Sequence, residues 1–156
     1  MHGMVAPDLP EEGDEIVFAG SFTEYIDGPT PERRIDHKPE LHFRLGISEI
    51  EGGLALSFKA HARHKVSMQL EFAARPGGFL ELGGESVALA DGERHFLNGP
   101  ARIVCGGDAL EFGGDLVVAH RDLAGGNFTK NPGITSLIIA PRTPYDGVIT
   151  IRGCEV

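Results

Sequence analysis

The sequence has no tryptophan, two cysteines, fewer basic than acidic residues and no long apolar run. The absence of tryptophan and the presence of only two tyrosines make a lectin that stacks sugar rings on an aromatic platform an unfavourable interpretation. Two cysteines cannot form the disulfide framework of a small secreted domain. No apolar run approaches the roughly 18 residues that a membrane span requires. We therefore expect no membrane partner.

The charge balance excludes a second class of partner. Lysine and arginine number 14 against 23 aspartate and glutamate residues, for a net charge of −9. Such a surface has no basic stripe to displace counterions from phosphates, so we expect no nucleic acid. The first 15 residues show neither the basic start nor the apolar centre of a signal peptide, which leaves the cytoplasm as the default location. A polar start is also consistent with a piece of a longer protein.

Glycine is abundant, and its arrangement predicts the fold. Six Gly-Gly pairs divide short β-prone runs, at positions 52–53, 77–78, 83–84, 106–107, 113–114 and 125–126. Between them, apolar and polar residues alternate with the period of two that a half-buried strand requires. Leu41, Phe43 and Leu45 alternate with His42 and Arg44 in this way. Residues 1–14 lack such a pattern and are predicted to be a flexible segment before a single domain at 15–156.

About a dozen short strands separated by turns indicate an all-β fold. We predict strands at residues 15–19, 41–47, 54–58, 66–72, 79–82, 86–89, 94–97, 101–105, 109–112, 116–119, 136–140 and 148–152. The predicted architecture is an antiparallel β-sandwich of the jelly-roll kind, or a barrel, with about 10–12 strands. Residues 101–120 are its clearest part, a three-run meander that ends at His120. Asn98-Gly99 is a two-residue hairpin signal, although the proline that follows allows a longer turn. Cys105 and Cys154 are expected to be reduced and mostly buried, with a disulfide between them left open.

Four residues form a candidate metal site: His61, His64, Glu71 and His120. Two histidines, a carboxylate and a later histidine after a Gly-rich turn resemble the metal-binding pattern of cupins, which are small β-barrels. The resemblance implies a divalent metal and an isomerase or oxygenase activity. His61 and His64 are three residues apart, however, so they share a face only if residues 60–65 form a turn. Without that turn, we expect no cofactor.

A polar strand face is the alternative site. His42, Arg44, Ser67, Gln69 and Glu71 would place hydrogen-bonding side chains on two neighbouring strands, and His42, Arg44, Gln69 and Glu71 are the candidate ligand-binding residues. The two long connections, residues 21–39 and 121–133, are further candidate contact surfaces, since binding function concentrates in loops on a rigid scaffold.

From about Lys65 to its end, the chain also resembles a known group. The runs VSMQLEF, PGGFLEL and HFLNGPARIVCGGDALEFGGDLVVAHR, followed by SLIIAPRTPYDGVITIR, are similar to the C-terminal β-sandwich region of bacterial heparinase-like, polysaccharide-processing proteins. The resemblance implies a sandwich that packs beside a catalytic domain, and it transfers no catalytic residue. We therefore predict a non-catalytic module, ligand-contacting or oligomerising, whose partner is a saccharide or another protein subunit, including a second copy of itself. The alternative is a cupin-type metal-dependent enzyme.

Overall fold

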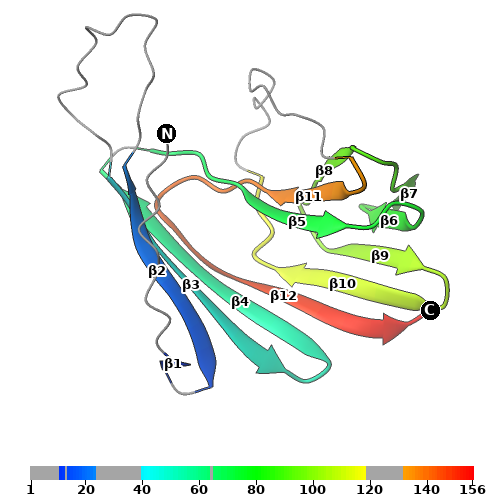
Figure 1. Ribbon diagram of the computed structural model, residues 1–156, viewed down its shortest axis with the longest axis horizontal. Coiled ribbons are helices and arrows are strands. Elements are labelled where there is room, and N and C mark those ends of the chain that lie inside the picture. Colours follow the sequence, from blue (N-terminus) through cyan, green and yellow to red (C-terminus); the bar gives the residue numbers. More distant parts are fainter. Residues whose placement is uncertain (1–10, 13, 24–39, 64, 119–131) are drawn as a thin grey trace, which may run out of the picture.

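The computed structural model describes residues 11–12, 14–23, 40–63, 65–118 and 132–156 (Figure 1). These residues form twelve strands in two sheets and no helix. None of them therefore belongs to a helix long and apolar enough to cross a membrane. The prediction of an all-β sandwich is confirmed.

The larger sheet has nine of these strands, and every neighbouring pair in it is antiparallel. In spatial order they are β1 (Glu11–Glu12), β2 (Glu15–Thr23), β3 (Glu40–Ile50), β4 (Gly53–Ala62), β12 (Tyr145–Glu155), β10 (Asp108–Gly114), β9 (Ala101–Cys105), β6 (Phe79–Leu82) and β7 (Glu85–Ala88). The short β1, which lies within the segment predicted to be flexible, pairs with the start of β2.

The smaller sheet has three strands, β5 (Leu70–Ala74), β11 (Thr135–Ile139) and β8 (Arg94–Phe96), in that order. The central strand β11 is antiparallel to β5 and parallel to β8. A parallel pair needs a long crossover, and here the chain between β8 and β11 first adds β9 and β10 to the larger sheet.

The main core lies between the two sheets. Leu137 and Ile139 of β11 meet Leu80, Phe112 and Ile149 of the larger sheet in one buried cluster. All five residues of β11 are buried, and its two polar side chains are hydrogen-bonded: the Thr135 hydroxyl donates to the Ala90 carbonyl at 2.7 Å, and the Ser136 hydroxyl donates to Glu71. A second cluster lies nearer the other end, where Phe58, Ala60 and Met68 pack against apolar residues of β3, namely Leu41, Phe43 and Leu45.

Two crossing segments tie the sheets together, and they correct one predicted strand. The strand predicted at 66–72 begins only at Leu70. Before it, the chain runs beside the segment between β11 and β12: Val66 and Thr143 exchange hydrogen bonds, and the Met68 N–H donates to the Pro141 carbonyl at 2.9 Å. Residues 66–68 therefore pass from one sheet to the other, which alternation alone does not reveal.

The predicted meander at 101–120 has two strands, β9 and β10, and not three. Gly114 has a φ of 85°, and the Asp115 carboxylate accepts a hydrogen bond from the Val148 N–H at 2.9 Å, so the chain turns out of the sheet there. Leu116 then enters the core, and Val118 forms a single bridge with Ala140. His120 lies outside the described residues.

The Asn98-Gly99 signal does not form a hairpin either. The strands that flank it, β8 and β9, belong to different sheets, so this segment connects the two layers. Leu97 and Ala101, on either side of it, are both buried in the main core. The burial of these two side chains, together with Pro100, favours a crossing over a tight two-residue turn.

The cysteines are free. β10 lies between their two strands, so Cys105 and Cys154 are separated by two strand spacings, about 9.6 Å, whereas a disulfide needs Cα atoms within roughly 7 Å. Cys105 is exposed, so the expectation of mostly buried thiols is wrong for that residue.

Candidate functional site

The hairpin of β3 and β4 brings two histidines together on the outer face of the larger sheet. Ile50 pairs with Gly53 across a tight turn, and this register places His42 directly opposite His61. Their rings are stacked, with centroids 5.1 Å apart and an interplanar angle of 17°. Both residues are exposed, whereas Ala60 beside His61 is buried in the second core cluster. The imidazoles therefore face away from the core.

The next pair of positions along these strands carries charge. Lys59 pairs with Arg44 on β3 and with Asp146 on β12. The Lys59 ammonium lies 2.9 Å from the Asp146 carboxylate, and both side chains are well exposed. Exposed ion pairs of this kind contribute at most about 1 kcal/mol to stability. The Lys59–Asp146 pair matters for the site because it holds one cation and one anion beside the two histidines.

Arg44 is held from the other side by a carboxylate of β2. Its guanidinium donates to Glu15 at 2.6 Å, and the Ser57 hydroxyl donates to the other oxygen of the same carboxylate at 2.8 Å. Gly46 makes this possible: a Cβ atom there would lie 1.8 Å from a Glu15 oxygen. The Glu15 side chain therefore crosses the surface of the strand at the one position that has no side chain.

These contacts set the electrostatics of the cluster. The hydrogen bond from Arg44, followed by that from Ser57, holds the pKa of Glu15 below its usual value of 4.5. Glu15 is therefore ionised at neutral pH and balances Arg44, just as Asp146 balances Lys59. The site carries two cations and two anions beside two imidazoles. This balance suits a neutral ligand rich in hydrogen-bonding groups.

An open pocket of about 570 Å³ lies over these residues. Its charged and imidazole lining side chains are His42, Arg44, Lys59, His61 and Asp146. Because the strands are held by sheet hydrogen bonds on both sides, the donors and acceptors have fixed spacing. Chemically, the pocket can bind and orient a polar molecule.

Tyr145 fixes the end of β12 that borders the pocket. Its side chain lies over Gly147, where a Cβ would come within 2.5 Å of the hydroxyl, and it donates to the Asp115 carbonyl at 2.7 Å. Burial, and next the charges of Asp115 and Asp146, raise the pKa of Tyr145 above 10.0. The phenol is therefore neutral at physiological pH and acts as a hydrogen-bond donor.

The structure separates the predicted ligand-binding residues into two groups. His42 and Arg44 lie in the pocket. Gln69, just before β5, accepts a hydrogen bond from Arg94 at 3.2 Å, and Glu71 on β5 accepts one from the Ser136 hydroxyl. The expectation that these residues lie on neighbouring strands is wrong, because β3 and β5 belong to different sheets.

The candidate metal residues are described only in part. His61 is on the outer face of the larger sheet, and Glu71 is on the opposite side of the sandwich, because Leu70 and Phe72 on either side of it pack into the core. The structure does not bring these two together. His64 and His120 lie outside the described residues, so the four-residue set stays a prediction. Within the described part of the chain, no three His, Cys, Asp or Glu side chains are grouped to hold a metal ion.

Sequence reasoning missed part of this site. Lys59 could have been predicted from the sequence, because a two-residue turn at Glu51-Gly52 fixes the β3–β4 register and places Lys59 opposite Arg44. Glu15 and Asp146 gave no such signal, since their strands join the hairpin through distant parts of the chain. Of the predicted contact loops, residues 24–39 and 119–131 lie outside the described residues.

Comparisons of the chain with protein-family models, curated proteins and solved structures find no significant match. The resemblances to heparinase-like proteins and to cupins therefore stay predictions.

Proposed function

We propose that this chain is a non-catalytic β-sandwich module that binds a neutral saccharide in the pocket of β3, β4 and β12, within a carbohydrate-processing context. The observation that carries the proposal is the stacked pair of His42 and His61 beside two internally balanced ion pairs, over an open pocket of about 570 Å³. That volume lies within the range of small-molecule sites.

Three properties of the pocket support a saccharide in particular. A sugar offers many hydroxyls that both donate and accept hydrogen bonds, and the pocket supplies the Asp146 carboxylate as an acceptor and the Arg44 and Lys59 cations as donors. Its charges cancel, so a strongly anionic or cationic ligand gains little. The pocket is also open, as is common where one end of a longer glycan must leave the site.

Saccharide binding is testable with the intact chain. Calorimetric titration with a panel of neutral mono- and oligosaccharides should find one that binds, with dissociation constants in the micromolar to millimolar range typical of open sites. His42→Ala and His61→Ala should each weaken that binding at least about tenfold, because each removes one ring of the stacked pair. Circular dichroism and thermal melting of each variant confirm that the sheet is intact.

Two matched variants make the result specific. Arg152→Ala removes an exposed cation from the same face of β12, outside the pocket, and should leave the affinity unchanged. Gln69→Ala changes the predicted binding residue that the structure places elsewhere, and should also have no effect. Loss of binding in Gln69→Ala but not in His42→Ala would overturn the choice of site. Failure of every saccharide in the panel would overturn the choice of ligand.

A further inference from the structure

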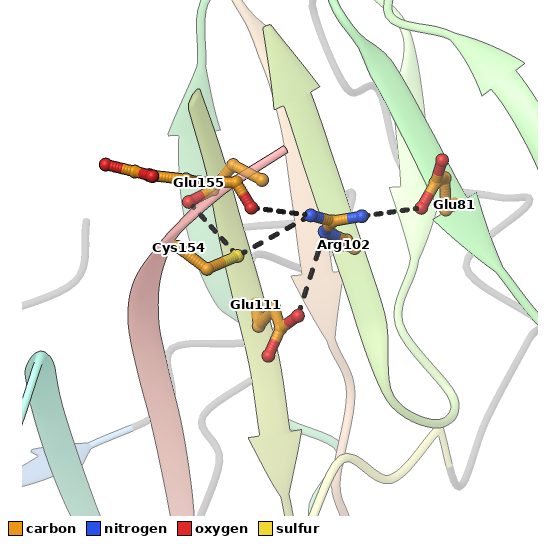
Figure 2. A network of polar contacts seen from close by, with 6 residues as sticks. Glu81, Arg102, Glu111, Cys154 and Glu155 are labelled. Atoms are coloured by element: carbon orange, nitrogen blue, oxygen red, sulfur yellow. Dashed lines mark hydrogen bonds and ion pairs between the residues drawn. The ribbon is translucent and has the colours of Figure 1, made fainter. Parts of the chain in front are cut away.

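A row of side chains with alternating charge crosses the outer face of the larger sheet at β6, β9, β10 and β12, away from the pocket. Strand registers place Glu81 opposite Arg102, Arg102 opposite Glu111, and Glu111 opposite Arg152. Four side chains on β6, β9, β10 and β12 thus form a line with the signs minus, plus, minus, plus. We call Glu81, Arg102, Glu111 and Arg152 the charge row. Figure 2 shows Glu81 and Glu111 beside the guanidinium of Arg102.

The charge row is loosely held within the chain. The Arg102 guanidinium lies 3.9 Å from Glu81 and 3.7 Å from Glu111, which is too far for a hydrogen bond in either case. Its firm contact is with the backbone carbonyl of Glu155, at 3.2 Å, and its Nε has no hydrogen-bond partner among the described residues. The side chains of Glu81 and Glu111 are 48% and 55% exposed. Both carboxylates are therefore accessible to a partner.

A second line of residues runs beside the first and is apolar. Two positions further along the same four strands are Phe79, Val104, Ala109 and Cys154, again opposite one another in register. We call these four residues the apolar row. Phe79 is 54% exposed, one of the largest exposed hydrophobic side chains in the described part of the chain. The small Ala109 is buried, and the half-buried Cys154 sulfur lies 3.8 Å from the Arg102 guanidinium. The patch thus combines a projecting ring with shallow positions on the same face.

We propose that this patch is a twofold interface with a second copy of the chain. A twofold axis along the strands, between β9 and β10, places each copy's β9 over the other's β10 and its β6 over the other's β12. Arg102 then faces Glu111 of the second copy, and Glu81 faces its Arg152. The same rotation places Phe79 over the small Cys154, so both charge and size are complementary. A self-complementary patch of this kind closes as a dimer.

The charge of the whole chain favours this patch over the rest of the surface. With a net charge of −9, two copies repel one another wherever acidic residues predominate. The charge row is neutral, and in the proposed dimer every charge in it faces its opposite. The saccharide pocket is not covered: Lys59 and Asp146 lie six residues further along β4 and β12 than Gly53 and Arg152, beyond the short strands β6 and β7 of the second copy. The dimer therefore does not depend on the proposed function.

Reciprocal charge changes test the dimer directly. The patch is small, so we expect the wild type to dimerise with a Kd on the order of 10–100 µM in sedimentation velocity. Glu81→Arg alone places arginine against arginine at both symmetric contacts, and Arg152→Glu alone places glutamate against glutamate, so each variant should be monomeric at protein concentrations near that Kd. Mixed together, the two variants place arginine against glutamate at both contacts. Native mass spectrometry should then show the heterodimer restored to within about threefold of the wild-type affinity.

Two apolar changes serve as test and control. Phe79→Asp should weaken the dimer at least about tenfold, while Leu110→Ser, a change at a similarly exposed residue on the opposite face of β10, should leave it intact. Thermal melting confirms that each variant folds. The proposal is overturned by a wild type that is monomeric up to about 1 mM, by assemblies larger than two, by a mixture that fails to restore the heterodimer, or by Leu110→Ser abolishing the dimer.

Discussion

Two arginine–glutamate clusters lie on one face of the larger sheet and differ in how they are closed. At one end, Arg44 and Glu15 are in direct contact at 2.6 Å, and Ser57 completes the coordination of the carboxylate. At the other, Arg102 lies between two carboxylates at 3.7 and 3.9 Å without a hydrogen bond to either. The same residue types thus form two arrangements. Glu15, Arg44 and Ser57 make a closed cluster, hydrogen-bonded within the chain, that rigidifies the pocket, whereas the charge row leaves its charges available to a partner.

The difference comes from a missing side chain. Glu15 reaches Arg44 because Gly46 leaves room for its carboxylate to cross the strand. In the charge row no glycine lies between the opposed charges: Arg102, Glu111 and Arg152 stand directly opposite one another, one to a strand. At neighbouring-strand spacing, about 4.8 Å, opposed side chains attract one another without necessarily meeting end to end.

Gly46→Ala is expected to have the largest effect on stability. The added Cβ would lie 1.8 Å from the Glu15 carboxylate and 2.6 Å from the Ser57 hydroxyl, so both must move and the closed cluster opens. We expect a fall of several degrees in Tm by calorimetry. Gly99→Ala is the matched control, because nothing lies within 4 Å of its added Cβ. Its Tm should be unchanged or slightly raised, through the lower entropy of the unfolded chain. Equal Tm values for the two variants would contradict the role assigned to Gly46.

The second prediction concerns pH and separates the two clusters. Because the pKa of Glu15 is lowered in the folded state, its stabilising contribution is complete above its unfolded value of 4.5 and is lost as the pH falls through the lowered pKa. The difference in unfolding free energy between the wild type and Glu15→Gln should therefore be constant above that value and shrink below it. Urea unfolding between about pH 7 and pH 3 measures this difference. A difference that stays constant over the whole range would show that Glu15 is not held by Arg44 in solution.

The sequence predicts local pattern well and long-range register poorly. The alternation of Leu41, Phe43 and Leu45 identified β3 and its buried face, and a tight turn at Gly52 is enough to pair His42 with His61. The contact of Glu15 with Arg44 could not be predicted from the sequence, since β2 joins β3 through a long connection that does not fix their register. The predicted polar face failed for a related reason. Alternation continues through Ser67 and Gln69 while the chain crosses between the sheets, so the pattern does not mark the change of sheet.

Glu111→Gln should have the smallest effect on the folded monomer. The Oε1–Nε distance of 3.7 Å to Arg102 offers no hydrogen bond to lose, and the side chain is 55% exposed, so solvent screens the attraction. We expect the unfolding free energy to change by less than about 1 kcal/mol, measured by urea unfolding at a concentration low enough to keep the chain monomeric. The same variant removes two charge pairs from the proposed dimer, because Glu111 of each copy faces Arg102 of the other. It should therefore weaken dimerisation while sparing the fold. A stability loss as large as that of Gly46→Ala would mean that the row is closed within one chain and has no charge left for a partner.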